Sequence, residues 1–148
     1  MHPMQSERPH GVPTHVPASA ADVTVKAVAV NVPRLRRAAT RAARWLGADQ
    51  PTVTRIALAV SEAASNSVLH AFPTTPGRMR VLVSEGAHDG DIEVRVSDDG
   101  IGLTPRPDSP GLGLGLGLIA EVADDLTISR LPRAGTEIVM RFAPRLVA

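Results

Sequence analysis

Three polar side chains recur at helical spacing in a segment whose other residues are mostly apolar or small. Glu62, Asn66 and His70 stand at i, i+4 and i+8 within IALAVSEAASNSVLHAF, so a helix would carry all three on one face. A buried carboxylate or amide is costly unless it is hydrogen-bonded or binds a cation. One carboxylate, one amide oxygen and substrate phosphates would suit Mg²⁺, whereas His70 suits this ion poorly. Because Glu-x-x-x-Asn is a common spacing, a solvent-facing stripe without function fits this helix equally well.

A second group of candidate residues is the turn Asp98-Asp99-Gly100-Ile101-Gly102, which follows a β-rich run. Its glycines would let the backbone approach a flat ligand closely. A fixed carboxylate there can accept a hydrogen bond from an exocyclic amino group such as that of adenine. An ordinary Asp-Gly turn is the competing interpretation of the same residues.

The third candidate is a glycine-rich segment in which Gly111, Gly113, Gly115 and Gly117 alternate with leucines. Four glycines would weaken a strand. We therefore predict a glycine loop that leads into a helix over residues 118–125 and offers free N–H groups to phosphate. No strand leads directly into the segment and no Gly-Lys-Ser/Thr follows it, which excludes the Rossmann fingerprint and the Walker A loop.

The elements that must position these residues follow from periodicity and from turn-forming residues. We predict strands over residues 23–30, 78–84, 92–97, 126–130 and 136–142, and helices over residues 34–46, 52–72 and 118–125. This order predicts an α+β fold, a two-layer sandwich in which a mixed, mostly antiparallel sheet is covered on one face by helices.

The helix predicted over residues 34–46 is rich in arginine. Its sequence RLRRAATRAARWL places Leu35, Ala39, Ala42 and Leu46 on one stripe, with the arginines around it. Most of this charge can stay in water. A solvated face and a surface for a partner both fit the arrangement.

Length and composition bound the number of domains. The 148 residues, of which 43% are hydrophobic, are enough for one domain with its own core. The first residues are rich in Pro, Ser and His and cannot bury enough apolar surface to offset the entropy of ordering. We expect a disordered tail over residues 1–21 and one folded domain over residues 22–148.

Several function classes are excluded by the same totals. A formal net charge of +1 and an aromatic content of 2% argue against direct binding of nucleic acid. No apolar run approaches the roughly 18 residues of a membrane span, and the first residues lack the apolar region of a secretory signal. The absence of cysteine excludes disulfides and thiol catalysis. We expect a cytoplasmic protein without a membrane partner.

The motifs gain weight from their order along the chain. They are Glu62-x-x-x-Asn66, Asp98-x-Gly100-x-Gly102, Gly113-x-Gly115 and Gly135-Thr136. In this order they resemble the N, G1, G2 and G3 boxes of the GHKL ATPase superfamily, which includes gyrase, heat-shock chaperones, histidine kinases and mismatch-repair ATPases. The surrounding sequences LAVSEAASNSVLHAF, VSDDGIGL and GLGLIAEVADDL look like those of bacterial anti-sigma-factor serine kinases. The resemblance covers about residues 22–143 and implies a Bergerat-type ATP-binding fold.

The resemblance implies a role for each candidate site residue, with ATP and Mg²⁺ as cofactors. Glu62 would be the general base toward the attacking hydroxyl group, and Asn66 would be the Mg²⁺ ligand. Asp98 would bind the adenine amino group, with Thr136 supporting the base nearby. The glycines that would shape the pocket and cradle phosphate are Gly100, Gly102, Gly113 and Gly115.

The resemblance also implies a function. The chain would be an ATP-dependent serine-protein kinase and anti-sigma factor that phosphorylates an anti-anti-sigma (STAS-type) protein in a partner-switching circuit regulating transcription. A sigma factor and a second copy of the chain, in a homodimer, would be its other partners. The alternative is an ATP-binding regulatory interaction module with little or no kinase activity. The presence of Glu62 favours the kinase, because a pure binder would not need a base.

Overall fold

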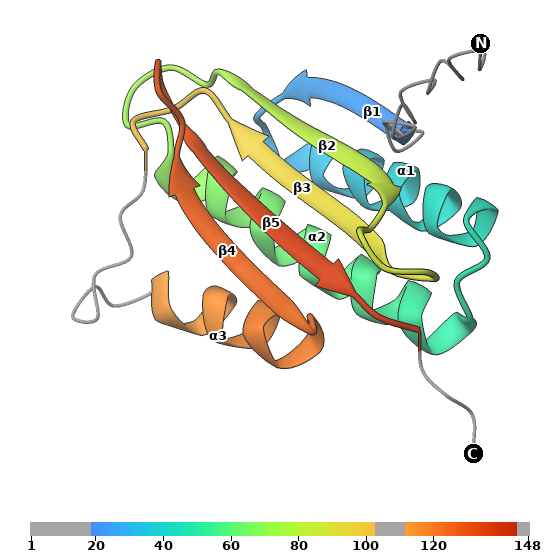
Figure 1. The fold of residues 1–148 in the computed structure, drawn as a ribbon. Helices are drawn as coiled ribbons and strands as arrows, with labels where there is room; N and C mark the ends of the chain where they lie inside the picture. The colour runs from blue at the N-terminus through green and yellow to red at the C-terminus, as the bar shows by residue number, and fades with distance from the viewer. Residues whose placement is uncertain (1–18, 103–111, 145–148) are drawn as a thin grey trace, which may run out of the picture.

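The computed structural model describes residues 19–102 and 112–144 of the chain, and Figure 1 shows how their strands and helices are arranged. The strands are β1 (Ser19–Lys26), β2 (Arg78–Glu85), β3 (Ile92–Asp98), β4 (Asp125–Arg130) and β5 (Thr136–Phe142). The helices are α1 (Val32–Trp45), α2 (Gln50–His70) and α3 (Leu112–Val122), and a 3-10 turn, η1 (Ala29–Asn31), precedes α1.

The five strands form one sheet in the order β1-β2-β3-β5-β4. All four pairings among the described strands are antiparallel, which corrects the prediction of a mixed sheet. Two helices connect β1 to β2, and these two strands run in opposite directions. One helix connects β3 to β4, and these two strands run in the same direction. They form no parallel pair, because β5 lies between them.

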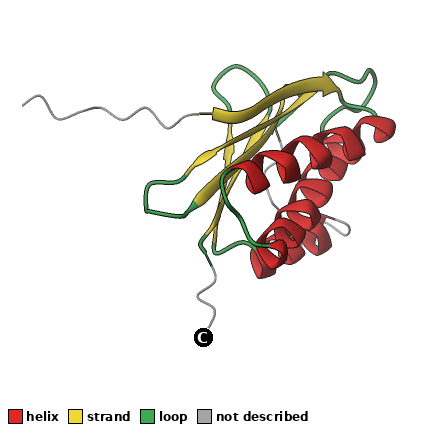
Figure 2. Cartoon of the chain, turned by 90° about the vertical axis from the view of Figure 1, so that its right-hand side faces the viewer, coloured by secondary structure: helices red, strands yellow, loops and turns green. Residues whose placement is uncertain are grey.

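The sheet and the helices form two layers. Figure 2 shows the strands as one layer with every described helix on the same side of it. In β3 and β5 every second residue is buried, because successive side chains of a strand point to opposite faces and only one face meets the helices. The predicted α+β sandwich is therefore confirmed. No helix among the described residues is both long and apolar enough to cross a lipid bilayer.

The first strand lies further toward the N-terminus than the sequence predicts. Ser19 already pairs with Ser84 of β2, so residues 19–21 belong to the sheet, and the rest of the expected tail, residues 1–18, lies outside the described part of the chain. The strand ends at Lys26, because Asn31 Nδ2 donates a hydrogen bond of 2.9 Å to its carbonyl oxygen and the chain turns through η1. The apolar alternation over residues 27–30 was therefore wrongly predicted as strand.

The glycine-rich segment is helical from Leu112, which corrects the predicted loop. Glycine lowers helix stability by about 1 kcal/mol per residue relative to alanine, but tertiary packing can outweigh this cost. Ile119, in the middle of α3, is fully buried in the common core. The helix also ends at Val122, earlier than the predicted residue 125, because Asp125 starts β4.

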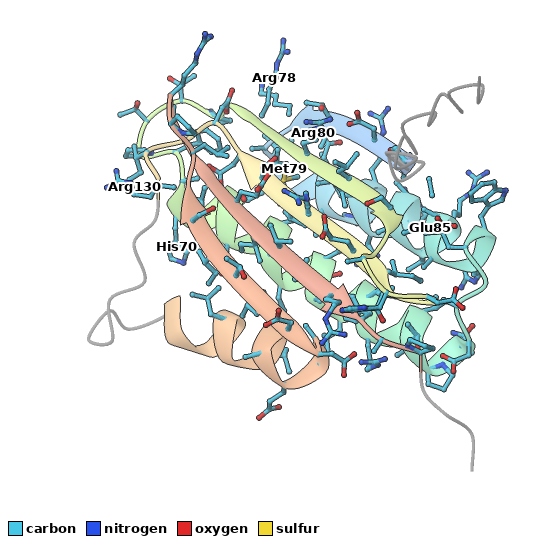
Figure 3. The ribbon with its side chains drawn as sticks, in the orientation of Figure 1. His70, Arg78, Met79, Arg80, Glu85 and Arg130 are labelled. Atoms are coloured by element: carbon cyan, nitrogen blue, oxygen red, sulfur yellow. The ribbon has the colours of Figure 1, made fainter. Side chains whose placement is uncertain are left out.

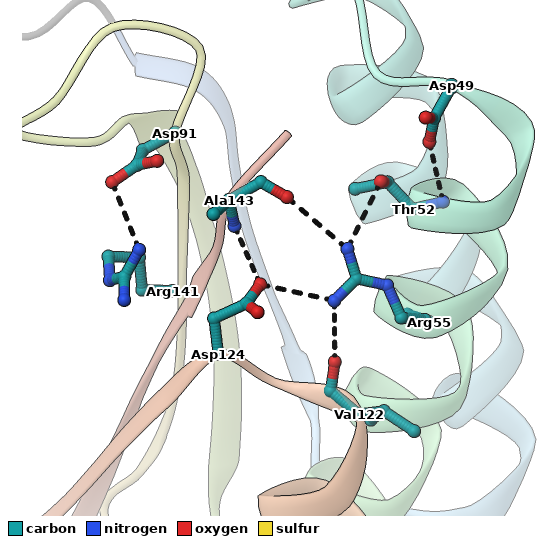
Figure 4. Close-up of polar contacts among 8 residues, drawn as sticks. All are labelled: Asp49, Thr52, Arg55, Asp91, Val122, Asp124, Arg141 and Ala143. Atoms are coloured by element: carbon teal, nitrogen blue, oxygen red, sulfur yellow. Dashed lines mark hydrogen bonds and ion pairs between the residues drawn. The ribbon is translucent and has the colours of Figure 1, made fainter. Parts of the chain in front are cut away.

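Arg55 joins the N-terminal part of α2 to the C-terminal ends of α3 and β5 (Figure 4). Its guanidinium group donates to the carbonyl oxygens of Val122 and Ala143 at 2.9 and 3.4 Å, and forms an ion pair of 3.2 Å with Asp124. Asp124 in turn accepts a 2.8 Å hydrogen bond from the backbone N–H of Ala143. The guanidinium also lies 5.6 Å from the centroid of the Phe142 ring. Arg55 therefore fixes the C-terminal end of α3 against α2.

We expect Arg55→Ala to lower the free energy of unfolding by about 2–4 kcal/mol, because it removes the ion-pair partner of the partly buried Asp124 and the side-chain donor to two carbonyl oxygens. The measurement is equilibrium unfolding in urea. Arg41→Ala is the matched control, since Arg41 is an exposed residue of α1, and its effect should stay within about 0.5 kcal/mol. Equal losses in the two variants would contradict the role assigned to Arg55.

Candidate functional site

Asp98 is the last residue of β3 and lies buried between the sheet and α2. It follows Ile92, Val94 and Val96 with a period of two, so its side chain points to the helix-covered face, as theirs do. Its Oδ1 accepts hydrogen bonds from the backbone N–H of Gly100 at 3.0 Å and of Thr136 at 3.3 Å. A buried carboxylate requires such donors, because its desolvation is costly. The predicted residues Asp98, Gly100 and Thr136 are thus brought together.

Ser67 is a site residue that the sequence analysis missed. Its hydroxyl group donates a 2.9 Å hydrogen bond to Asp98 Oδ2, across a sequence separation of 31 residues, and it is 5% exposed. The signal was present, since Ser67 is a polar residue inside an apolar helix and directly follows Asn66. The i, i+4 pattern identifies Glu62 and Asn66, which share one face of the helix. It does not identify Ser67, which lies on the neighbouring face that meets the sheet.

Gly135 permits the close approach between the β4–β5 turn and Asp98. Its φ angle is +101°, a value that L side chains rarely adopt. A Cβ atom at this position would overlap the carbonyl oxygen of Asp98. Glycine at position 135 therefore allows the amide of Thr136 to reach the Asp98 carboxylate. A similar contact occurs at Gly100, where a Cβ atom would overlap the carbonyl oxygen of Ala71 at the end of α2.

Arg130 borders the second glycine of the turn. Gly102 has a φ of +76°, and a Cβ atom added there would lie 2.9 Å from Arg130 Nε. Arg130 also donates a 3.2 Å hydrogen bond from Nη2 to the carbonyl oxygen of Ile101. Figure 3 shows Arg130 and His70 at the same end of the molecule, and the backbone N–H of Ile101 bonds to the carbonyl oxygen of Ala71, next to His70. These residues surround the turn without contacting Asp98 through any described hydrogen bond.

Glu62 and Asn66 form the second part of the site, where α2 faces α3. A Cβ atom on Gly115 would lie 3.2 Å from both polar atoms of the Asn66 amide and 3.3 Å from Glu62 Oε2. Asn66 is 7% exposed, and its Nδ2 has no hydrogen-bond partner among the described residues. Such an orphaned buried amide is destabilising by about 1–3 kcal/mol unless a ligand or water satisfies it. The two predicted residues are thus brought together with Gly115.

Helix α2 links the two parts of the site. Ser67, which bonds to Asp98, directly follows Asn66, which lies beside Glu62 and Gly115. Gly113 lies in the first turn of α3, and the backbone N–H groups at the positive end of a helix favour an anion. His70 is half-buried at the end of α2. It lies about one helical turn beyond Asn66 and about two beyond Glu62. A buried acceptor at a strand end, an amide nitrogen without a partner among the described residues and a helix N-terminus together suit a ligand with amino and phosphate groups.

An open sheet backed by helices on one face, with polar groups at the helix–sheet junction, defines the chain as an α+β protein of two layers. The chain belongs to the family described as histidine kinase-like ATPase domain, which matches residues 25–142. Membership in this ATPase family implies that the chain binds ATP. Its sequence motifs resemble those of anti-sigma-factor kinases, and the relatives described next are named anti-sigma F factors.

Two relatives and one solved structure illustrate the similarity. The anti-sigma F factor of Oceanobacillus iheyensis is 27% identical over 99 residues, which cover 60% of this chain and 67% of that protein. The anti-sigma F factor of Clostridium novyi is 30% identical over 100 residues, which cover 60% and 69%. A crystal structure of the RsbU and RsbW domains of a Mycobacterium tuberculosis protein matches with a TM-score of 0.63 and 20% identity, covering 86% of this chain and 35% of that one. This likeness shows the fold.

A matched pair of substitutions in α3 tests the contact between Gly115 and the Glu62–Asn66 pair. Gly117→Ala should raise the free energy of unfolding by about 0.5–1 kcal/mol through helix propensity, because a Cβ atom there meets nothing within 4 Å. Gly115→Ala gains the same propensity but pushes against Asn66 and Glu62. We expect it to weaken ATP binding, whereas Gly117→Ala leaves binding unchanged, as measured by calorimetric titration. Equal ATP affinities would contradict this contact in the ligand-binding state.

Proposed function

We propose that the chain binds Mg-ATP at the junction of α2, α3 and the β3 turn, and transfers the terminal phosphoryl group to a serine of a partner protein. The observation that carries the proposal is the combination of a buried carboxylate, Asp98, with a buried amide nitrogen, Asn66 Nδ2, that has no partner among the described residues. Both are features that a ligand with complementary groups would satisfy.

Asp98 is the residue we propose for recognition of adenine. Oδ1 accepts two backbone N–H groups, and the one contact of Oδ2 among the described hydrogen bonds is with the Ser67 hydroxyl. Each carboxylate oxygen has about two lone-pair sites, so Oδ2 can accept the exocyclic amino group of adenine as well. Ser67 and the backbone donors hold the carboxylate in place before ligand binding. Gly100 and Gly102 keep the turn free of side chains beside it.

Asn66 and Glu62 are the residues we propose for the phosphate end. Asn66 Oδ1 suits Mg²⁺, and its Nδ2 can donate to a phosphate oxygen, which would satisfy the orphaned group. Mg²⁺ would supply neutralisation of charge on the phosphates. The first turn of α3, with Gly113 and Gly115, would offer backbone N–H groups to the same phosphates.

Glu62 lies one helical turn before Asn66, on the same face of α2. We propose that it accepts the proton of a serine hydroxyl whose oxygen forms the new bond to the γ-phosphorus. The bond from that phosphorus to the β–γ bridging oxygen breaks, and ADP leaves. General-base catalysis of this kind contributes about 10²–10⁴-fold, and Glu62 is half-buried, so a protein substrate can reach it.

The partners we propose follow from the relatives, which are named anti-sigma F factors. A sigma factor would be held by this chain, and an anti-anti-sigma protein of STAS type would be phosphorylated by it, in a cytoplasmic partner-switching circuit. We also propose a homodimer, and one folded unit that includes β1 from Ser19. A regulatory module that binds ATP without phosphoryl transfer is the alternative that the tests below distinguish.

The adenine assignment is tested by Asp98→Asn. The amide replaces one acceptor with a donor, so the variant should lose the bond to the adenine amino group and bind ATP at least about tenfold more weakly. Calorimetric titration with Mg-ATP measures the change, and the melting temperature controls for folding. Ser67→Ala should give a smaller loss, whereas Ser65→Ala on the side of α2 facing α1 should give none. Binding of Asp98→Asn as tight as wild type would refute the pocket.

The kinase step is tested by Glu62→Gln, which keeps the size of the side chain and removes the base. We expect ATP binding to persist, and the rate of phosphoryl transfer to a partner serine to fall by about 10²–10⁴-fold. The assay is transfer of labelled phosphate to a purified anti-anti-sigma protein. Undiminished phosphorylation by the variant would rule out the base role. ATP binding by the wild type without any transfer would instead support the regulatory module.

A further inference from the structure

The exposed face of α1 carries a line of arginines, which we name the arginine stripe and define as Arg34, Arg37, Arg41 and Arg44. All of its members are exposed. Their spacing of three, four and three residues places them, together with Trp45, within a sector of about 100° around the helix. The opposite face of α1 is the buried one, with Leu35, Ala39 and Ala43 fully inaccessible. The stripe spans about 15 Å along the helix axis.

No carboxylate neutralises this charge within the described part of the chain. Helix α1 contains no acidic residue in its first turn, and none of the four guanidinium groups forms a hydrogen bond or ion pair with another described residue. Like charges at i, i+3 or i+4 destabilise a helix by about 0.2–0.5 kcal/mol per pair. Arg34 adds a cation near the positive end of the helix dipole. The stripe therefore lowers the stability of the isolated domain.

Arginines on the open face of the sheet are arranged differently. Arg80, which Figure 3 labels on β2, bonds to Asp22 at 2.7 Å, and this bond holds the pKa of the Asp22 carboxyl below its ordinary value. Arg95 pairs with Glu93 at 2.6 Å and with Glu137 at 3.1 Å, and Arg141 pairs with Asp91. Three arginines of this surface thus have carboxylate partners, whereas no arginine of the stripe has one among the described residues.

Trp45 extends the stripe at its C-terminal end. It is 75% exposed, although a tryptophan in water leaves a large apolar area uncovered. Tryptophan and arginine are the residue types most enriched at the energetic centres of protein interfaces. A large exposed ring beside unpaired guanidinium groups is therefore typical of a surface that becomes covered.

We propose that the arginine stripe and Trp45 form a docking surface for an acidic helical segment of a partner protein. Carboxylates repeated at three- and four-residue spacing would match the guanidinium groups in charge and in position, and Arg–carboxylate pairs can be bidentate. A lipid surface does not fit, because the apolar face of α1 is buried in the core. Duplex nucleic acid fits less well, because the chain has a net charge of only +1 and the stripe is a single line.

The docking surface is separate from the nucleotide site. Glu62, Asn66 and Asp98 lie where α2 meets α3 and the sheet, whereas the stripe lies on the solvent side of α1. A partner bound there would leave the nucleotide site open. The proposal goes beyond the phosphoryl transfer proposed above and does not depend on it.

Trp45 provides the readout, because the chain has a single tryptophan and no tyrosine. The probe is a synthetic helical peptide of about 20 residues without aromatic residues, with glutamates at i, i+3, i+7 and i+10. A shift of Trp45 emission on titration into the full chain measures binding. We expect Arg37→Glu/Arg41→Glu to weaken it at least about tenfold, with ATP binding unchanged.

The matched control is Arg78→Glu/Arg133→Glu, which changes the net charge equally at exposed positions on the open sheet face and in the β4–β5 turn and should bind the probe almost as the wild type does. An equal loss in both double variants would overturn the proposal, because it would show a response to overall charge. So would equally tight binding of a peptide with the same composition in shuffled order. Tighter binding of duplex DNA or of phosphatidylserine vesicles than of the peptide would assign the surface to a different partner and refute the one proposed. Loss of ATP binding in Arg37→Glu/Arg41→Glu would contradict the separation of the two sites.

Discussion

The burial of the Asp98 carboxylate is the constraint on which the rest of the site depends. A charged group at this depth is tolerated only with several donors, and here they come from three elements that are distant in sequence. Ser67 belongs to α2, Gly100 to the turn after β3, and Thr136 to β5. The carboxylate thereby joins both layers of the fold, and it explains why glycine is required at position 135, where any side chain would collide with the Asp98 carbonyl. A ligand that bonds to Asp98 meets a group already held in position.

Helix α3 is constrained at both of its ends. Arg55 binds the carbonyl oxygen of its last residue, Val122, and Gly115 contacts the Glu62–Asn66 pair near its beginning. The absence of a side chain at position 115 lets two helices approach closely where polar groups face each other. Helix α3 thus lies against α2 at two places. One is beside the Arg55–Asp124 ion pair, and the other is beside Asn66, whose Nδ2 has no partner among the described residues. If nucleotide binds at the proposed site, this contact couples its binding to the position of α3.

Charge is distributed over the molecule according to what covers it. On the open sheet face, Arg80 and Arg95 pair with carboxylates on neighbouring strands, a pattern that is stable in water without a partner. The exposed face of α1 has arginines and a tryptophan but no carboxylate. Charged side chains are thus paired within the domain on the sheet face but not on α1. Such a domain is suited to bind nucleotide and partner at different surfaces.

The sequence by itself determined what depends on local periodicity and on the order of motifs. The alternation of Ile92, Val94, Val96 and Asp98 is enough to turn the aspartate toward the helices, and the spacing of Glu62 and Asn66 is enough to place them on one face. Only the tertiary structure decided the rest. Ser67 is bonded to Asp98, the glycine-rich segment is helical and β5 lies between β3 and β4 because of contacts between distant residues, and no local propensity encodes such contacts.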